Sequence, residues 1–572
     1  MTPVLRRRVV PDVPLLAEPS LHPVLARVYA ARGVVSCDQL DLRLSRMLAP
    51  SQLGGLEAAC ALLRDAIAHD ARIVIVGDFD CDGATGAAVA YRGLRLLGAR
   101  HVAVRVPNRA IHGYGLTPAL VEEIVAAGVP DLLITVDSGI ACLPGVRAAK
   151  QAGCRVLVTD HHLPPDPLPE ADAIVNPNLR DDAFPSKVLA GVGVMFYLLL
   201  ALRASMRESG AYAVRGEPDL SALLDLVALG TVADVVPLDQ NNRVLVAAGL
   251  KRIRAGKASA GVAALIEVSK RRKEELTATD LGFSIGPRVN AAGRLEDMQI
   301  GIACLCSDDP VEARELAARL DAINSERRGV QQDMVAQAEA AVAHLQLDGD
   351  LPPVLCLHEP EWHAGVIGLV ASKIKERVHR PVFAFASSSE GSSELKASAR
   401  SVPGVHLRDL IAELDMREPG LILRFGGHAM AAGLSLEAAH LARFRDAMTR
   451  LAMVRIDPAV LAAEVWTDGE LSGRDIDLAL AEALREGGPW GQSFPEPLFD
   501  GAFDIVSVRV VGERHVAMRL VGSDGVAHEA IAFGAHVGTL PSGRIRVAFQ
   551  PSVDEWRGDR RVKLLVRHFS PA

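Results

Sequence analysis

Between residues 70 and 235, short continuous apolar runs alternate with longer helical patterns. The expected strands are residues 73–76, 102–106, 132–136, 156–158 and 173–175. The expected helices are residues 83–97, 118–127, 143–153, 189–206 and 220–232. Strands that are apolar throughout, rather than at every second position, are typical of parallel sheets covered by helices on both faces. The pattern therefore predicts a doubly wound, parallel-sheet α/β domain.

Three further patterns follow along the chain. Residues 310–347 are rich in Ala, Glu, Gln and Arg and contain one glycine, Gly329, which predicts a long helix connecting two domains. A second α/β stretch has expected strands at 354–358 and 381–386, a helix at 366–378 and a glycine-rich run at 425–433. After residue 455, short strands are expected at 503–510, 515–520, 530–533, 545–549 and 562–566. Such a tail predicts a small β-barrel, and an oligonucleotide-binding (OB) fold is one candidate.

These patterns divide the chain into five parts. They are an N-terminal segment (1–45), the parallel-sheet domain (46–305), the connecting helix (306–347), a second α/β domain (348–455) and the β domain (456–572).

Acidic motifs directly follow three of the predicted strands. These are GDFDCDG with Asp78, Asp80 and Asp82, TVDSG with Asp137, and VTDHH with Asp160, His161 and His162. Ligands of open parallel sheets bind outside the carboxyl ends of the strands, so we expect these side chains to converge. Two carboxylates ~4 Å apart repel by roughly 4 kcal/mol at an effective dielectric of about 20. Such a cluster persists if its members protonate, spread into water or bind cations, and we favour divalent cations.

The residue types narrow the choice of metal. Asp together with His suits Mn²⁺ or Mg²⁺, and two such ions ~3.5–4 Å apart can bridge a phosphate and activate water. A lone central carboxylate such as Asp137 can offer one oxygen to each ion. An isolated DxDxDG is equally compatible with a solvated turn or a calcium loop, but the twelfth position of such a loop is Val89 and not Glu. The two histidines alone are also compatible with an exposed turn, and Asp234 with a helix cap.

Composition limits the class of protein further. The 572 residues are 49% hydrophobic and 23% charged, as expected for a globular protein of three or four domains. A net charge of −8 argues against a generally basic nucleic-acid-binding coat but allows a local basic groove. The eight cysteines form no CxxC pair, which indicates reduced thiols in a cytoplasmic protein. Pro11 and Pro14 interrupt any signal peptide, and the longest apolar run, 188–202, is too short to cross a membrane.

Ten ordered motifs resemble the DHH phosphoesterase superfamily and, more narrowly, its RecJ family of bacterial single-strand-specific exonucleases. They are GDFDCDGATG, PNRAIHGYGL, TVDSG, VTDHH, NPN, LAGVGV, LGTVADVVPL, GPRVNAAGR, EWHAGVIG and FGGHAMAAG. The resemblance extends over nearly the whole chain and implies a DHH catalytic domain, a DHHA1-type second domain and an OB-like C-terminal domain. It implies hydrolysis of single-stranded DNA to mononucleotides from the 5′ end, with two Mn²⁺ or Mg²⁺ ions, in recombination and repair. It also suggests single-strand-binding protein and repair helicases as partners of a monomer that does not associate with membranes.

The resemblance implies a role for each motif residue. The first ion would be held by Asp78, Asp80 and Asp137, and the second by Asp82, Asp137, His162 and Asp234. His161 would touch the scissile phosphate, and Asp160 would orient His161 and His162. The implied catalytic residues are therefore Asp160 and His161. The residues implied to bind the strand are Arg109, Arg288, Ser398, Arg400, Gly426, Gly427 and His428. The chain departs from the family pattern at Ser138, where Asn is frequent, and at Ala397 and Ala399, where Gly is usual.

Other features leave alternatives open. Basic clusters at 252–257, 270–273 and 373–380 are compatible with contacts to a DNA backbone or with solvated helix faces. The aromatic residues Trp466, Trp490, Phe494 and Trp556 are compatible with base stacking or with core packing. Two rival functions are a small-substrate DHH phosphatase acting on nanoRNA, cyclic dinucleotides or pyrophosphate, and a non-catalytic nucleic-acid-binding scaffold. The complete carboxylate set disfavours a scaffold, which has no need for that charge density.

Overall fold

The computed structural model describes residues 3–12, 21–108, 111–213, 216–347, 351–389, 391–512, 515–535, 540–556 and 559–572. The chain forms two compact units. Unit 1 comprises Met1–Arg7, Ser325–Thr467 and His568–Ser570, and unit 2 comprises Arg8–Asn324, Asp468–Arg567 and Pro571–Ala572. The long helix α13 (Pro310–Leu347), predicted between the same two residues, contributes to both units.

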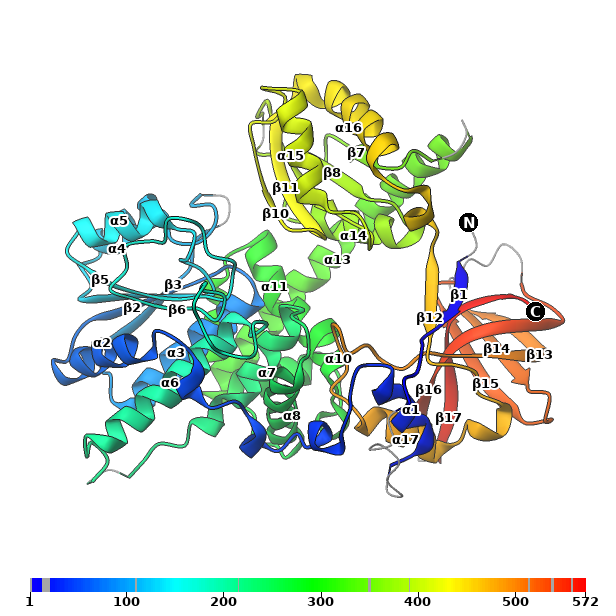
Figure 1. Ribbon diagram of the computed structural model, residues 1–572, viewed down its shortest axis with the longest axis horizontal. Coiled ribbons are helices and arrows are strands. Elements are labelled where there is room, and N and C mark those ends of the chain that lie inside the picture. The colour runs from blue at the N-terminus through cyan, green and yellow to red at the C-terminus, as the bar shows by residue number, and fades with distance from the viewer. Residues whose placement is uncertain are drawn as a thin grey trace. The chain divides into compact units, whose positions relative to one another are not determined.

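Unit 2 contains a five-stranded parallel sheet in the order β3-β2-β4-β5-β6. Its strands are β2 (Ile73–Gly77), β3 (Val102–Arg105), β4 (Leu132–Val136), β5 (Arg155–Thr159) and β6 (Ala173–Val175). The flanking helices are α2 (Leu56–Ala68), α3 (Cys81–Leu97), α4 (Pro118–Ala126), α5 (Leu143–Gln151) and α6 (Gly191–Glu208). Helices α4 and α5 cover one face, and α2, α3 and α6 cover the other (Figure 1).

Both faces of this sheet are buried, which explains why its strands are apolar at successive positions. Val74 and Val76 of β2 pack in one cluster with Leu120 and Ile124 of α4. The alternate residues Ile73 and Ile75 are fully buried as well and point to the opposite face. The predicted doubly wound domain is thereby confirmed.

A helical layer packs beside the parallel-sheet domain of unit 2. It consists of α7 (Leu224–Ala233), α8 (Gln240–Arg254), α9 (Ala260–Val268), α10 (Ala278–Asp280), a π-helix (Leu281–Ile285), α11 (Gly286–Leu295) and α12 (Gln299–Cys306). Of these helices, only the region of α7 was predicted from the hydrophobic pattern. The last turn of α8 contains Lys251, Arg252 and Arg254. In the sequence, this region was identified as a basic cluster but not as a helix.

Unit 1 contains a mixed sheet in the order β10-β11-β9-β8-β7. Its strands are β7 (Leu355–His358), β8 (Val382–Ser387), β9 (Glu394–Arg400), β10 (Arg424–Gly427) and β11 (Ala431–Glu437). Its helices are α14 (Ile367–Val378), α15 (Leu407–Arg417) and α16 (Leu441–Arg455). Phe383 and Phe385 of β8 pack edge-on against Phe444 of α16, which places α16 on one face of the sheet. A parallel pair formed by β1 (Val4–Arg7) and β12 (Glu464–Thr467) also belongs to this unit.

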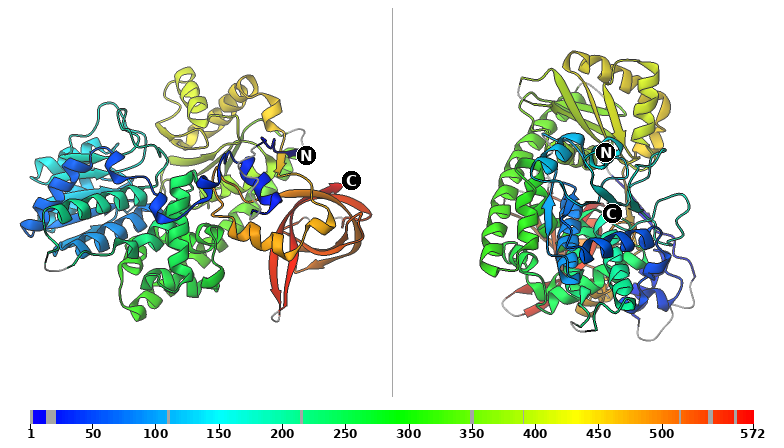
Figure 2. Two further views of the ribbon diagram at one scale, coloured as in Figure 1. Left: turned by 60° about the horizontal axis from the view of Figure 1, so that its bottom comes forward. Right: turned by 90° about the vertical axis from the view of Figure 1, so that its left-hand side faces the viewer.

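A closed five-stranded barrel in the order β13-β14-β15-β17-β16 forms the C-terminal part of unit 2 (Figure 2). Its strands are β13 (Phe499–Val511), β14 (His515–Val521), β15 (Ala527–Phe533), β16 (Arg544–Trp556) and β17 (Asp559–Pro571). All five strands extend beyond the predicted runs, and β13 begins with the buried residues Phe499, Asp500 and Gly501, where Asp500 and Gly501 interrupt the apolar pattern. The expected OB-like barrel is confirmed.

The four aromatic residues singled out in the C-terminal part of the sequence have different environments. Trp490 and Phe494 are buried and stack on each other with ring centroids 5.2 Å apart, so they pack in the core and do not present a surface for bases. Trp466 on β12 is 43% exposed. The side chain of Trp556 lies outside the described residues. None of the described helices is both long and apolar enough to cross a membrane.

Candidate metal centre

Three acidic positions lie side by side at the carboxyl edge of the parallel sheet. In the strand register, Gly77 is opposite Val136, and Val136 is opposite Thr159. The next residues along the three strands are Asp78, Asp137 and Asp160, and all three are buried. The parallel topology therefore brings together the three motifs that are separated in the sequence.

The loop after β2 places two further carboxylates. Asp80 is the N-cap of α3 and accepts hydrogen bonds from the backbone amides of Asp82, at 2.9 Å, and Gly83, at 3.0 Å. A methyl group on Gly83 would lie 2.5 Å from the Asp78 nitrogen, so only glycine allows this helix start so close to Asp78. The motif DxDxDG thus forms the N-terminus of α3, and Asp80 caps this helix.

Asp82 is 1% exposed and faces the first turn of α6. Its two oxygens accept hydrogen bonds from the backbone amides of Gly191, at 2.6 Å, and Val192, at 3.0 Å. Burial, followed by the charges of Asp234 and Asp80, nevertheless raises the pKa of Asp82 well above its ordinary value. The helix N-terminus stabilises the anionic form, but further positive charge is needed to keep this cluster ionised at neutral pH.

Asp137 occupies the centre of the cluster. Its backbone has a left-handed φ of 61°, and a methyl group on Gly191 would lie 2.5 Å from its Cβ. Burial, followed by the charges of Asp82 and Asp80, raises the pKa of Asp137 well above its ordinary value. Burial and the charge of Asp80 also raise the pKa of Asp234 to about 7. Asp234 directly follows α7 as its C-cap, so this helix positions it at the cluster.

The carboxylate of Asp160 accepts hydrogen bonds from three backbone amides, two of them in its own loop. Its oxygens lie 2.7 Å from the amide of His161, 3.1 Å from the amide of His162 and 2.9 Å from the amide of Ile140. The Nδ1 atom of His162 is 2.7 Å from Asp160 Oδ1. Burial alone would raise the pKa of Asp160, but the hydrogen bonds from His162 and the backbone hold it below its ordinary value.

The two histidines have different surroundings. His161 Nε2 lies 3.1 Å from Asp137 Oδ1 and 3.7 Å from Asp234 Oδ2, in the middle of the carboxylates. His162 is held by Asp160 instead. Burial lowers the pKa of His162, but the hydrogen bond and charge of Asp160 outweigh this effect and raise it to about 9.

The NPN motif supports this loop, although no role was predicted for its residues. Asn176 Nδ2 donates to the His162 carbonyl at 2.9 Å, and Asn178 Nδ2 donates to the His161 carbonyl at 2.6 Å. Asn290, in the GPRVN motif, accepts from the Cys81 amide at 2.8 Å at the start of α3. Each asparagine is at least 14 residues away along the chain from the residue that it contacts, so the sequence provided no distinct signal for these contacts.

The described residues form three overlapping groups that could each hold an ion. They are Asp78 with Asp80 and Asp137, Asp82 with His161 and Asp234, and Asp137 with His161 and His162. Asp137 is shared between two groups, and so is His161. The donors are carboxylate oxygens and imidazole nitrogens without thiols, which is the set that Mn²⁺ and Mg²⁺ prefer. Asp137 Oδ1 and Asp234 Oδ2 are buried and accept no hydrogen bond from a described donor, so the residues fit a bound cation.

The residues predicted to bind the strand belong to both units. Arg109 lies outside the described residues. Arg288 on α11 of unit 2 is largely buried, and its Nε lies 2.8 Å from Asp321 Oδ1 on α13. In unit 1, Ser398 and Arg400 lie on β9, where Arg400 donates to Ser398 Oγ at 3.1 Å.

The glycine-rich run of unit 1 forms the β10–β11 hairpin. Gly426 and Gly427 end β10, and the His428 amide donates to the Ala431 carbonyl at 2.8 Å across the turn. In the sheet, Arg400 is opposite Ala431 and Ser398 is opposite Gly433. The hairpin and β9 are therefore adjacent, and the structure brings the predicted residues of unit 1 together.

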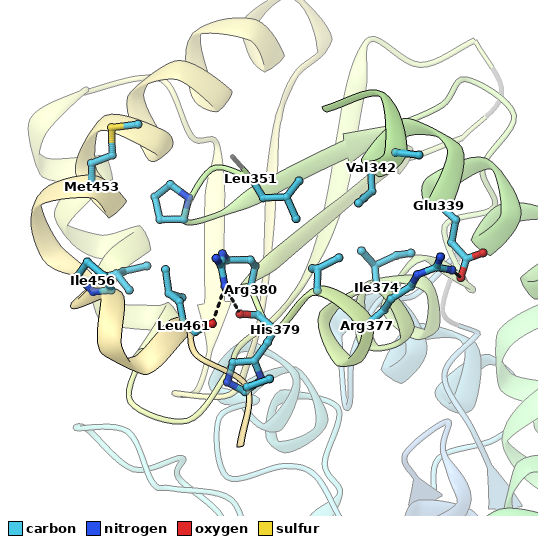
Figure 3. Close-up of a pocket in the computed structure, with 15 residues that line it drawn as sticks. Glu339, Val342, Leu351, Ile374, Arg377, His379, Arg380, Met453, Ile456 and Leu461 are labelled. Carbon is cyan, nitrogen blue, oxygen red and sulfur yellow. Dashed lines mark hydrogen bonds and ion pairs between the residues drawn. The ribbon is translucent and has the colours of Figure 1, made fainter. Parts of the chain in front are cut away.

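A cavity of about 800 Å³ also lies in unit 1 (Figure 3). Arg377, His379, Arg380 and Ile374 line it together with Leu461, whose carbonyl accepts a hydrogen bond from Arg380 at 2.7 Å. It shares no residue with the carboxylate cluster or with the predicted strand-binding residues. We therefore assign the chemistry to the carboxylate cluster.

Comparison with known proteins agrees with this architecture. The DHH family N-terminal domain matches residues 72–231, the DHHA1 domain matches 342–453, and the RecJ OB domain matches 467–568. The single-stranded-DNA-specific exonuclease RecJ of Dickeya dadantii (strain 3937) is 50% identical, and the alignment covers 99% of each chain. Two crystal structures of RecJ from Thermus thermophilus are similar over 100% of this chain. The Mn²⁺ complex has a TM-score of 0.81 at 31% identity with 80% of its chain covered, and the Mg²⁺ complex has 0.76 at 29% with 78% covered.

A parallel sheet with this acidic edge, followed by a DHHA1 domain, defines a metal-dependent protein of the DHH class. The identity over the whole length and the OB domain narrow the class further. The chain belongs to the RecJ family of single-stranded-DNA-specific exonucleases, as its motifs predicted.

Proposed function

We propose that this protein is a metal-dependent exonuclease that removes mononucleotides from the 5′ end of single-stranded DNA during recombination and repair. The main support is the cluster of buried carboxylates and imidazoles at the edge of the parallel sheet, which forms three overlapping candidate ion sites. Its geometry agrees with the name of the Dickeya relative and with the Mn²⁺ and Mg²⁺ of the Thermus structures.

The donor set is consistent with two divalent cations. Asp78 and Asp80 would hold one ion with Asp137, and Asp82 and Asp234 would hold the other with His161. Bound divalent cations would neutralise the charge of the substrate phosphate and activate water, so that no side-chain nucleophile is required. The protein contributes a rigid frame, because Asp80 and Asp82 are each fixed by two backbone amides.

The contacts of the two histidines support a division of roles different from the one the motif resemblance implied. His161 Nε2 is surrounded by Asp137 and Asp234, which suits a metal ligand. His162 is anchored by Asp160 through Nδ1, and this leaves Nε2 to donate to a phosphate oxygen. We therefore propose that His161 is the ligand and that His162 contacts the phosphate, with Asp160 as the positioning residue for His162.

In unit 1, we propose that Ser398, Arg400 and the backbone of Gly426, Gly427 and His428 contact the phosphates of the strand. Guanidinium groups match phosphate oxygens in geometry and charge. Arg400 lies beside the start of α14, where a methyl group on Gly368 would be 3.1 Å from its Nη2. Arg109 and Arg288 are proposed to contribute from unit 2.

A digestion of single-stranded DNA labelled at either end tests the proposal. With Mn²⁺, a 5′-labelled 30-nucleotide strand should release labelled mononucleotide at once, whereas a 3′-labelled strand should shorten progressively. EDTA should stop both reactions, and blunt duplex DNA should resist. An intact 30-mer together with rapid turnover of dinucleotides would favour the small-substrate phosphatase instead, and strand binding without any hydrolysis would favour the scaffold. A monomeric state, protein partners and a cytoplasmic location stay predictions from the sequence.

A further inference from the structure

Two basic clusters of the sequence come together on the surface of unit 2. Residues 251–273 contain eight Lys and Arg and one acidic residue, Glu267, in a chain whose net charge is −8. A methyl group on Gly256, after α8, would lie 3.4 Å from Lys273 Nζ. Arg254 Nε donates to the Leu276 carbonyl at 2.9 Å, which joins the end of α8 to the second cluster. The two clusters therefore form one surface.

The arginines and lysines of this surface differ in their contacts. Arg272 pairs with Glu275 and Glu555, and Arg271 pairs with Asp280. The lysines are Lys251, Lys257, Lys270 and Lys273, all exposed. None of these four ammonium groups forms an ion pair with a carboxylate of the described residues, so their charges are available to a ligand.

An exposed aromatic ring adjoins the lysines. Phe283 is 83% exposed, although Leu281 and Ile285 of the same π-helix are fully buried. Ser284 Oγ accepts a hydrogen bond from Arg271 Nε at 3.2 Å, so the ring lies next to the second basic cluster. Burial of a phenylalanine side chain favours folding. Short π-helical segments are frequent at functional sites. The exposed ring of Phe283 is therefore available to a ligand.

The π-helix also adjoins the metal centre. A methyl group on Gly282 would lie 3.1 Å from Val232 Cγ1, and one on Gly286 would lie 3.2 Å from Ala233 Cβ. These are the last residues of α7, and Asp234 follows them. The helices α7, α8 and α11 are drawn in green in Figure 1. The surface thus begins beside a proposed metal ligand and extends away from it across the ends of α8 and α9.

We propose that Phe283 and the four lysines form a binding surface for the single strand beyond the nucleotides held at the metal centre. This inference rests on the proposed function. The ring of Phe283 stacks on a base, and the ammonium groups of Lys257, Lys270 and Lys273 neutralise successive phosphates. An aromatic ring next to cations suits a single strand, because its bases have free faces whereas those of a duplex are already stacked. An acidic peptide would use the lysines but would gain nothing from the ring.

Binding measurements with the full chain in EDTA test this surface without hydrolysis. The variants are Phe283→Ala, Phe283→Trp and the double variant Lys257→Glu with Lys273→Glu. Arg147→Glu is a single charge reversal that serves as a control, at an exposed position on α5, away from the proposed surface. Each protein is titrated with a 30-nucleotide oligothymidylate at several salt concentrations.

Loss of stacking in Phe283→Ala should weaken binding ~5- to 10-fold, and Phe283→Trp should stay within about 2-fold of the original chain. The double lysine variant should bind ~10-fold more weakly. In a plot of the logarithm of the binding constant against the logarithm of the salt concentration, the magnitude of its slope should be smaller by about 0.7 for each phosphate that it no longer neutralises. Arg147→Glu should change binding less than about 2-fold. With Mn²⁺, all variants should hydrolyse a 5′-phosphorylated trinucleotide at the original rate, because the surface is proposed to hold the nucleotides beyond those at the metal centre.

Unchanged affinity of both the Phe283→Ala and the double lysine variants would overturn the proposal. An equal loss on the trinucleotide and the 30-mer would also overturn it, because the substitutions would then act through the metal centre or through folding. Tight binding of polyglutamate that Phe283→Ala leaves unchanged and the double lysine variant abolishes, together with unchanged oligonucleotide affinity of Phe283→Ala, would point to an acidic protein ligand and against DNA. If the original chain binds the strand but hydrolyses nothing, the proposed function fails while the binding surface stands.

Discussion

The two sheets of this protein share a layered α/β architecture but present opposite chemistry. In unit 2 the parallel strands β2, β4 and β5 all end at one edge, where each is followed directly by a buried aspartate. In unit 1 the antiparallel neighbours β9 and β11 present Arg400, Ser398 and glycines along their length. The difference agrees with the proposed division of labour, in which the edge of carboxylates holds cations and the row of small and cationic residues contacts phosphates.

Strand direction is the physical origin of this difference. Parallel strands place the same end of every strand at one edge, so residues that follow the strands converge. Antiparallel strands alternate in direction, so residues far apart in sequence meet side by side within the sheet. Four sets of variants test the two sheets, and we order them by the size of the expected effect.

The substitution Asp137→Asn should have the largest effect. It removes the carboxylate shared by two candidate ion groups, and hydrolysis of single-stranded DNA should fall by at least ~10²- to 10³-fold. Initial rates at saturating Mn²⁺ measure the effect, while binding of the strand in EDTA should persist. The control is Asp131→Asn, at the opposite end of β4, where the carboxylate accepts from the Arg72 amide. Comparable rates for the two variants would contradict the position of the metal centre.

The histidine variants should separate a metal ligand from a phosphate contact. We expect His161→Ala to lower Mn²⁺ affinity ~10- to 100-fold, because its ring lies between Asp137 and Asp234. His162→Ala should retain most of the metal affinity and lose activity at saturating metal. Calorimetric titration of Mn²⁺ distinguishes the two. The reverse ranking would support the division of roles implied by the motifs alone.

The substitution Arg400→Ala should affect the substrate end and leave the metal centre intact. Loss of a charge-assisted contact to phosphate should raise the KM for 5′-phosphorylated strands ~10-fold and change kcat by less than about 3-fold. Strands with a 5′-hydroxyl should be affected much less. Arg424→Ala is the matched control, because Arg424 is on the neighbouring hairpin and pairs with Glu394. An equal loss on both kinds of 5′ end would argue against a phosphate contact.

The two hairpin glycines should differ in their effect on stability. Gly427 has a φ of +135°, and a methyl group there would lie 2.5 Å from the Ala431 carbonyl oxygen, whereas Gly426 has no atom within 4 Å. Gly427→Ala should therefore lower the free energy of unfolding by about 1–3 kcal/mol. Gly426→Ala should change it by less than about 0.5 kcal/mol. Denaturation midpoints in urea measure both, and equal midpoints would show that the hairpin adjusts to the added methyl group.

Much of the fold was predictable because it depends on local patterns. The continuous apolar runs identified the parallel strands. The predicted long helix has the same first and last residues as α13, Pro310 and Leu347. The helices α8, α9 and α12 were not predicted, because no strands alternate with them; α8 packs on α7, and α12 packs on α3 and α9. The hairpin of unit 1 was recognised only as a glycine-rich run, since glycine indicates freedom of the backbone and not a particular strand.

The sequence by itself determined which residue types gather at the metal centre, because each acidic motif directly follows a strand and parallel strands end together. Only the tertiary structure decided which atoms face one another. It directs Asp82 to the first turn of α6 and Asp160 to His162, and it places His161 between Asp137 and Asp234. It also joins two distant basic clusters beside Phe283. The physical reason is that the order of residues along the chain determines where backbone elements begin, whereas the direction of a side chain depends on the elements packed against it.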